Sequence, residues 1–385
     1  MILDVSMARL FLPSNQMAAR HGVVPSLDGL RAVSILIVLS AHFIDSRVFP
    51  GGLGVYIFFV ISGFLITRLL IVEYNGTGAV SLPLFYLRRI IRLYPVIIAF
   101  AACTIGLDIA LGRPYNLLEP ASGLGYFANY LYAYLDIHHI PQQMPFGPFW
   151  SLSVEEHFYI LLPLVFVLLR GDPTRLMWVF AGLCAACLGL RLTMAGLHPE
   201  YLNTLTFYAE SQYRLDSIGF GVILALACQM ERGRRALALM AHPVAATGAL
   251  AVVLACLVVR DPWFRETLRY TLLGCAVVVL ISAVLFDNRF QFVQQVLNTT
   301  ILVWIGRLSY SLYIWHGGVS SFLAVADQPH WQTVVADIVA TTAVAVISYF
   351  AVEQPFLLLR RHLRAPQPAL GLQSANRELH GEVGT

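Results

Sequence analysis

The sequence predicts an all-α membrane protein, a polytopic bundle of about ten transmembrane helices. Hydrophobic residues make up 58% of the 385 residues, charged residues make up 12%, and the mean hydropathy is +0.71. A soluble globule of this length needs more polar surface. The apolar residues are gathered into runs of about 20, the length of a helix that crosses the hydrocarbon core of a bilayer. The composition therefore excludes a soluble enzyme, and the net charge of +3 implies no nucleic-acid partner.

Ten apolar runs are long enough to be membrane spans. In chain order they cover residues 28–45, 53–72, 94–112, 149–169, 175–196, 215–230, 243–260, 270–286, 300–323 and 333–355. These runs divide the chain into a lead-in at 1–25, a transmembrane domain at 26–360 and a polar tail at 361–385. We expect the lead-in and the tail to be cytoplasmic and the tail to be disordered.

The placement of arginine predicts the orientation in the membrane. If the N-terminus lies inside, the inner segments carry Arg9, Arg20, Arg88, Arg89, Arg92, Arg170, Arg175, Arg232, Arg234, Arg235, Arg289, Arg360, Arg361, Arg364 and Arg377. The outer segments then carry Arg47, Arg113, Arg260, Arg265 and Arg269. Because cytoplasmic loops carry the excess of basic residues, we expect both termini in the cytoplasm. The membrane itself is expected to be the plasma (inner) membrane of a bacterium. The longest outer connection, 112–148, is long enough to cover an entrance from the far side.

The first run, LDGLRAVSILIVLSAHF, carries three ionisable residues: Asp28, Arg31 and His42. A charge at the bilayer centre costs about 2.5 to 3.5 kcal/mol on the lenient insertion scales, so such groups normally face protein or water. Arg31 and His42 are eleven residues apart. They therefore share one helix face, separated by about 16 Å along the axis. We interpret this face as the wall of a polar path. Alternatively, Arg31 extends to the inner interface and pairs with Asp28, and His42 marks the outer interface.

The fourth run begins FWSLSVEEHFYILLP and places polar groups at helical spacing. Ser151, Glu155 and Tyr159 recur at steps of four and so lie on one face. Two adjacent carboxylates cannot both be buried without a counter-ion, and arginines of other helices are the natural partners. We expect Glu156 and His157 to point elsewhere, toward the interface. A purely structural role for Glu155, in an ion pair that locks helices together, stays open at this point.

The ninth run contains SYSLYIWHGG, in which Ser309, Tyr313 and His316 share a face. Two hydroxyls and an imidazole on one face are suited to binding a polar substrate. Hydrogen bonding between neighbouring helices explains the same pattern without a substrate.

A basic segment, FYLRRIIRLYP, stands between the second and third runs. Arg89 and Arg92 are three residues apart with Arg88 beside them. A cytoplasmic loop attracts arginines for topological reasons alone. A pair of guanidinium groups at the mouth of a polar cavity also suits a ligand with several phosphates, because each group binds a phosphate bidentately.

Taken together, these segments resemble the acyltransferase family 3 membrane proteins. The matching pieces, in the family's order, are LDGLRAVSILIVLSAHF, GGLGVYIFFVISGFLIT, FYLRRIIRLYP, FWSLSVEEHFYILLP, RLDSIGFG, GRLSYSLYIWH and AVEQPF. They span nearly the whole chain, and their order is more specific than any single piece. The resemblance implies an integral-membrane O-acyltransferase that moves an acyl group, often acetyl, from a cytoplasmic acyl-CoA to a hydroxyl of a sugar or other polar acceptor. It also implies that His42 is catalytic, that Arg31 is essential and that Arg89 and Arg92 form the family's Arg-x-x-Arg pair.

The chemistry of acyl transfer suits these residues. A hydroxyl is a poor nucleophile at neutral pH, and a neutral histidine such as His42 can take its proton as it attacks the thioester. A covalent acyl-histidine is a variant of the same mechanism. We expect Arg31 to hold the pantetheine end of the donor or to offset charge on the developing oxyanion. Glu155 completes the predicted catalytic group, where it would orient Arg31 or His42.

Two further groups of residues are predicted to bind the substrates. Arg89 and Arg92, with Arg88, would hold the phosphates of acyl-CoA at the cytoplasmic mouth. The acceptor, a glycan or a glycosylated metabolite, is expected against Ser309, Tyr313, His316 and Tyr159.

A transporter is the alternative from another functional class. Proton-coupled carriers and acyl-group conduits also place Arg, Glu and His inside the membrane. The sequence has no pair of Gly- or Pro-broken helices in corresponding halves, as inverted-repeat carriers have. We expect no metal and no permanently bound cofactor, since Cys184-x-x-Cys187 lacks a second pair with which to form a zinc site.

Overall fold

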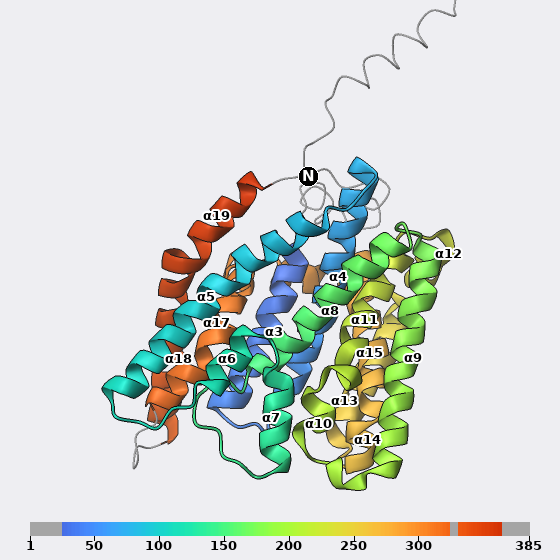
Figure 1. The fold of residues 1–385 in the computed structure, drawn as a ribbon. Helices are drawn as coiled ribbons and strands as arrows, with labels where there is room; N and C mark the ends of the chain where they lie inside the picture. Colours follow the sequence, from blue (N-terminus) through green and yellow to red (C-terminus); the bar gives the residue numbers. More distant parts are fainter. Residues whose placement is uncertain (1–24, 324–329, 364–385) are drawn as a thin grey trace, which may run out of the picture.

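The computed structural model describes residues 25–323 and 330–363, and the regular elements in this part of the chain are all helices (Figure 1). The long ones are α3 (Pro25–Phe43), α4 (Gly51–Thr77), α5 (Leu82–Ala110), α8 (Phe149–Leu168), α9 (Pro173–Leu197), α11 (Ser211–Ala227), α13 (Pro243–Val258), α15 (Leu268–Phe286), α17 (Thr300–Leu323) and α18 (His330–Ser348). The predicted all-α class is confirmed for the described residues. The predicted lead-in and tail lie almost entirely outside them.

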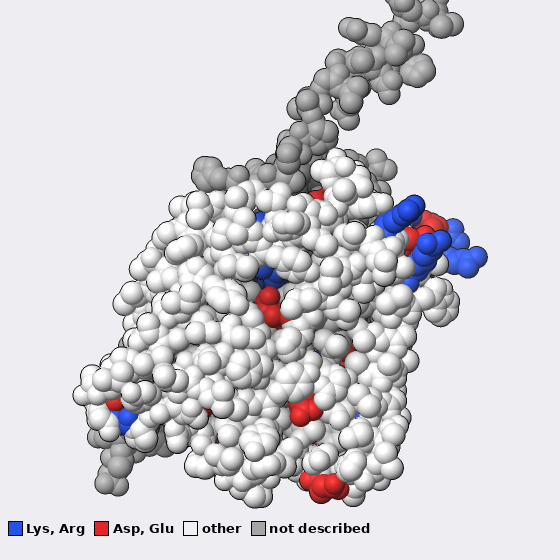
Figure 2. All heavy atoms as spheres, in the orientation of Figure 1, with Lys and Arg blue, Asp and Glu red and all other residues white. Residues whose placement is uncertain are grey.

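Short helices join the long ones at both ends of the bundle. They are α6 (Leu118–Leu124), α7 (Ala128–Ile137), α10 (Leu205–Ala209), α12 (Glu231–Met240), α14 (Pro262–Glu266), α16 (Gln291–Leu297) and α19 (Gln354–His362), with single turns at Pro199–Tyr201, Asn288–Phe290 and Tyr349–Glu353. In Figure 1, α12 lies at the upper end of the bundle, and α7, α10 and α14 lie at the lower end. Figure 2 shows a largely uncharged face, with a cluster of basic side chains at the end where α12 lies.

Seven of the described helices are long and apolar enough to cross a membrane, or up to eight if the bent pair α12 and α13 is one span. Each of the ten predicted runs falls on a helix. However, α11 and α13 have only 17 and 16 residues. Arg307, His316 and several hydroxyl side chains make α17 more polar than the seven. The multi-pass helical bundle is therefore confirmed, whereas the count of ten spans stays a prediction.

Two predicted boundaries were wrong. The third helix begins at Leu82 rather than at residue 94, because Pro83 in its first turn favours a helix start and Pro95 lies inside the helix without ending it. The connection 112–148 is not all loop, since it contains α6 and α7.

A buried carboxylate holds this connection in place. Glu119 accepts hydrogen bonds from the Tyr132 hydroxyl at 2.8 Å and from the backbone N–H groups of Gln143 and Met144 at 2.9 and 3.1 Å. Its side chain is 1% exposed, so these donors replace the water that a carboxylate otherwise needs. The connection is thereby fixed over the lower end of the bundle.

Glycines allow the central helices to approach closely. α3 packs against α4 and α17, and α4 packs against α11. A Cβ atom at Gly306 of α17 would lie 1.9 Å from the Asp28 carbonyl oxygen of α3, and one at Gly221 of α11 would lie 2.0 Å from the Val60 carbonyl oxygen of α4. Small residues at helix contacts are the usual means of association in lipid, where no hydrophobic force drives helices together.

A fully buried ion pair joins α9 and α11. Arg191 of α9 donates from Nη2 to the Asp216 carboxylate of α11 at 2.7 Å, and both side chains are 0% exposed. The same guanidinium donates to the Tyr213 carbonyl oxygen at 2.5 Å and to the Thr267 carbonyl oxygen at 3.2 Å. Asp216 belongs to the RLDSIGFG segment, so this part of the motif has a structural role.

Replacing Asp216 by Asn should destabilise the protein strongly. The change keeps the side-chain shape but leaves the Arg191 charge buried without a counter-ion, which costs about 3 to 5 kcal/mol in comparable pairs. Thermal unfolding of the purified protein in detergent measures the loss. As a control, Arg175→Gln removes an arginine of the same helix whose side chain is 72% exposed and lies 3.9 Å from Asp172, and it should leave the midpoint unchanged. Equal midpoints for Asp216→Asn and the control would contradict a stabilising ion pair.

Candidate functional site

Two cavities enter the bundle and meet near Tyr313, which lines both of them. The first, here named the arginine cavity, has a volume of about 270 Å³ and is lined by residues of α3, α4, α5, α8 and α17, including Arg31, Arg89 and Glu155. The second, named the histidine cavity, has a volume of about 1010 Å³ and is lined by His42, by parts of the 112–148 connection and by residues of α10, α11 and α14. The α3 helix contributes Arg31 to one cavity and His42 to the other.

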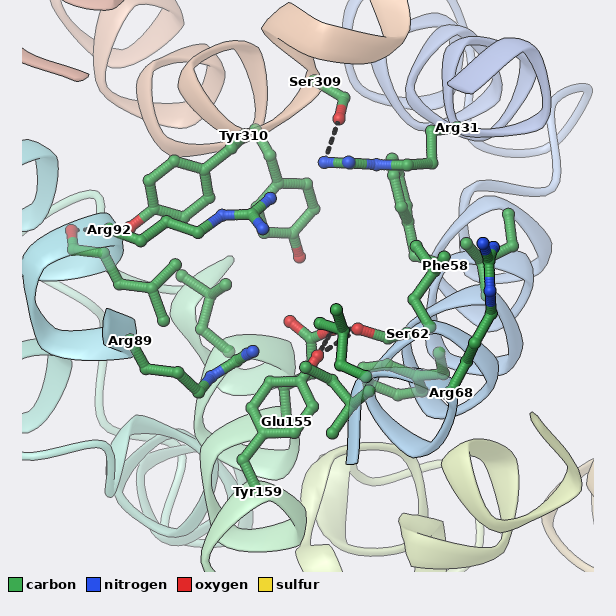
Figure 3. A pocket seen from close by; sticks show the side chains of 18 of the residues that line it. Arg31, Phe58, Ser62, Arg68, Arg89, Arg92, Glu155, Tyr159, Ser309 and Tyr310 are labelled. Atoms are coloured by element: carbon green, nitrogen blue, oxygen red, sulfur yellow. Dashed lines mark hydrogen bonds between the residues drawn. The ribbon is translucent and has the colours of Figure 1, made fainter. Parts of the chain in front are cut away.

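Polar groups converge inside the arginine cavity (Figure 3). Arg31 donates from Nη2 to the Ser309 hydroxyl of α17 at 2.9 Å. The Glu155 carboxylate accepts hydrogen bonds from Ser62 of α4 and from Tyr159, the latter at 2.8 Å. The ion pair of Arg31 with Asp28, the alternative considered from the sequence, is not formed in the described residues, where Asp28 lies 4.0 Å from Arg307.

The Arg-x-x-Arg pair reaches the same cavity from α5. Arg89 forms an ion pair with Glu156 at 3.3 Å, and its guanidinium lies 3.3 Å from the centre of the Tyr159 ring. Arg92 lines the cavity and has no hydrogen bond or ion pair within the described part of the chain. Arg68 of α4 adds a fourth arginine to the lining, against a single carboxylate from Glu155. The cavity is therefore strongly electropositive and suited to a polyanionic ligand.

The predicted direction of Glu156 was wrong, and Arg88 lies apart from the arginines with which it was grouped. Arg88 does not line the arginine cavity: it pairs with Glu73 at 3.1 Å and donates to the Leu363 carbonyl oxygen at 2.8 Å. Consecutive residues of a helix point about 100° apart, so Arg88 cannot share the direction of Arg89. Glu156 does not point to the interface, because Arg89 supplies its counter-ion inside the bundle. The expectation that arginines of other helices neutralise the adjacent glutamates is thereby confirmed for Glu156.

His42 lies at the end of α3 with its ring exposed to the histidine cavity. Its Nδ1 lies 2.9 Å from the Val38 carbonyl oxygen. A carbonyl can only accept a hydrogen bond, so Nδ1 carries the proton and the lone pair is on Nε2. The hydrogen bond therefore leaves Nε2 as the basic atom.

His316 supports the His42 ring from α17. The two rings meet edge to face with centroids 4.7 Å apart, and His316 is 0% exposed. Its Nδ1 lies 2.6 Å from the Tyr313 carbonyl oxygen, which leaves Nε2 as an acceptor without a partner among the described residues. Both imidazoles thus keep an Nε2 lone pair without a partner among the described residues, and that of His42 lies in the wall of the histidine cavity.

The four predicted acceptor residues are divided between the cavities. Ser309 and Tyr159 line the arginine cavity together with the predicted donor-binding arginines. Tyr313 lies between the two cavities, where its hydroxyl is 2.6 Å from that of Ser151. His316 lines neither cavity and contacts His42 instead.

Sequence reasoning missed Ser62, Arg68 and Tyr310 of the arginine cavity. Arg68 carried a usable signal, because it is a lone charge in the second apolar run. Ser62 and Tyr310 carried none, since their neighbours come from other helices. Within the described residues, no cluster of His, Cys, Asp and Glu has the geometry to hold a metal ion.

Comparisons with known proteins agree with this architecture. The profile of the family described as "Acyltransferase domain" matches residues 24–353. "Putative O-acetyltransferase SACOL0978" of Staphylococcus aureus (strain COL) is 29% identical over 351 residues, which cover 86% of this chain and 57% of the relative. "O-acetyltransferase OatA" of S. aureus (strain NCTC 8325) is 28% identical over the same shares. No solved structure is significantly similar to the chain.

The match extends through almost all of the described helices. The chain spans 57% of the length of these curated relatives, so their similarity concerns the part that contains the helical bundle. The family profile, in contrast, covers well over half of this chain, from the residue before α3 to the turn that follows α18. The chain therefore belongs to the acyltransferase 3 family of multi-pass membrane proteins.

Proposed function

We propose that this protein is a membrane O-acyltransferase that moves an acetyl or other short acyl group from acyl-CoA to a hydroxyl of a glycan or similar polar acceptor. The observation that carries the proposal is that two cavities of different chemistry share Tyr313 in their linings, and that His42 lines the second of them. The arginine cavity has the charge of a donor site, and the histidine cavity is the larger of the two. The names of the relatives, O-acetyltransferases, support the same reaction class.

The arginine cavity would receive the donor. Its volume of about 270 Å³ suits the pantetheine arm and the acyl group, while the nucleotide would stay at the mouth. Arg92, which has no ion-pair partner among the described residues, would bind a phosphate directly. Arg89 would join it by exchanging part of its contact with Glu156 for a phosphate oxygen.

The distance along α3 favours the first of the two roles considered for Arg31. About 16 Å of helix separates Arg31 from His42, and the two side chains line different cavities, which argues against a shared contact with one carbonyl group. Arg31 would therefore hold the donor arm, and its bond to Ser309 directs the guanidinium into the cavity. It would not act on the oxyanion that forms beside His42.

The histidine would act as general base from the junction. His42 Nε2 takes the proton of the acceptor hydroxyl while the oxygen attacks the thioester carbonyl carbon. The tetrahedral intermediate then collapses, the carbon–sulfur bond breaks, and the CoA thiolate leaves. The imidazolium of His42 then gives its proton to the thiolate, which restores the neutral histidine. His316 would be a positioning residue, because its ring packs against that of His42.

Replacing His42 by Ala should abolish acyl transfer while the protein still accumulates in the membrane. Mass spectrometry of surface glycans and secreted metabolites from wild type, a deletion strain and the complemented deletion measures the effect. The loss is expected to be at least about 100-fold, the contribution of a general base. His198→Ala is the matched control, because this histidine is exposed and pairs with Glu200. Restoration of the acyl group by the His42 variant would exclude His42 as the base.

Removing one guanidinium at a time tests the donor site. Arg92→Gln should raise the KM for acyl-CoA about tenfold or more, because a charge-assisted contact to phosphate is lost. Arg88→Gln should change it by less than about twofold, because Arg88 lies outside the cavity. Purified protein with acyl-CoA and an acceptor provides the assay. Equal KM values for acyl-CoA in Arg92→Gln and in the wild type would contradict this donor site. Movement of acyl groups across the membrane without any acylated product would favour a carrier.

A further inference from the structure

The Arg214 side chain is buried in the wall of the histidine cavity. The residue is 1% exposed, and its Nε and Nη1 have no hydrogen-bond partner among the described residues. No carboxylate of the described chain forms an ion pair with it, and the nearby Asp216 is engaged by Arg191. Buried arginines are normally paired with an anionic group, so Arg214 has the properties of a residue that binds an anionic ligand.

Aromatic rings surround the same guanidinium. Its carbon lies 4.1 Å from the ring centre of Tyr270 and 5.5, 5.6 and 5.7 Å from those of Tyr208, Trp150 and Tyr56. The ring faces attract a cation and offset part of the cost of burial, but they satisfy none of its N–H donors. All four rings also line the histidine cavity. Flat aromatic faces of this kind pack against the apolar faces of sugar rings.

Positive charge predominates in the lining of the histidine cavity. Arginines at four other positions line it: Arg47, Arg260, Arg265 and Arg269. The carboxylates in the lining are Asp136, which accepts a hydrogen bond from the Leu205 N–H at 2.8 Å, and Glu266, which accepts one from the Tyr270 hydroxyl at 3.0 Å. Both are thus engaged within the protein, and the lining attracts anions.

We infer that the histidine cavity binds an acceptor that is a carbohydrate carrying an anionic group, either a carboxylate or a phosphate. The anion would bind Arg214, the sugar ring would pack among the four aromatic side chains, and a hydroxyl would reach His42 in the same cavity. The inference rests on the proposed function, in which this cavity admits the acceptor. It narrows the acceptor from any polar hydroxyl compound to an acidic sugar.

Binding of matched probes to the full chain in lipid nanodiscs tests the inference without an acyl donor. The first pair is tetragalacturonate and its methyl ester, and the second is glucose 1-phosphate and glucose. Calorimetry should show that the anionic member of at least one pair binds about tenfold or more tightly than the neutral member, the effect of one charge-assisted contact. The pair that responds identifies the anion as carboxylate or phosphate. Equal binding within both pairs, or no binding of any probe, would overturn the inference.

Variants of Arg214 test whether this residue causes the preference for the anionic probe. Arg214→Gln should abolish the difference between the members of the responding pair, and Arg214→Lys should keep part of it, because the charge stays but the bidentate fork is lost. Arg234→Gln is the control, since this arginine lies on α12 and pairs with Glu231 outside the cavity. Size-exclusion profiles establish that the variants fold, and the wild-type comparison stands without them. An unchanged preference in folded Arg214→Gln would refute this site.

The binding experiment also separates the two proposals. An anionic preference that depends on Arg214, in a protein that transfers no acyl group, would retain the site and reject the transferase. Acyl transfer to a neutral sugar, without any preference for anionic probes, would retain the transferase and reject the anion site at Arg214.

Discussion

The close crossing of α3 and α17 is the constraint on which the site depends. Gly306 leaves room for the backbone of Asp28, so the two helices meet without side chains between them at that level. One turn further along, Arg31 reaches Ser309, and at the other end of α3 the His42 ring meets His316. Both predicted residues of α3 are thus supported by the same neighbouring helix. A bulkier residue at Gly306 would separate the helices and disturb both ends together.

Two kinds of charged group stand out inside the bundle. Arg191 is paired with Asp216 and also donates to backbone carbonyl oxygens, and Glu119 is satisfied by three donors, so these groups hold helices and a connection in place. Arg92 and Arg214 line cavities and lack such partners within the described residues. Charge inside a membrane protein is costly, and an unsatisfied charge is the costlier kind. The distinction separates groups that build the scaffold from groups available to ligands.

Periodicity predicted the helical class, because apolar runs of membrane length report on each helix separately. It also placed Arg31 and His42 on one face, and Arg89 and Arg92 on another, since these pairs depend only on spacing within a helix. It could not predict which helix each face meets. Ser62 and Arg214 line the two cavities because of contacts between helices that are distant in sequence. The number of arginines in a basic segment likewise does not reveal that the Arg88 side chain points away from the arginine cavity, toward Glu73.

The central claim is that the donor and the acceptor enter different cavities and meet beside His42. A photoreactive acyl-CoA, with a diazirine in a short acyl chain, tests this directly when its cross-links to the full chain are mapped by mass spectrometry. We expect labels on residues that line the arginine cavity, such as Phe58, Leu65 and Tyr310, and competition by unlabelled acyl-CoA. Labels confined to residues of the histidine cavity, such as Leu205 and Leu257, would contradict the separation of donor and acceptor.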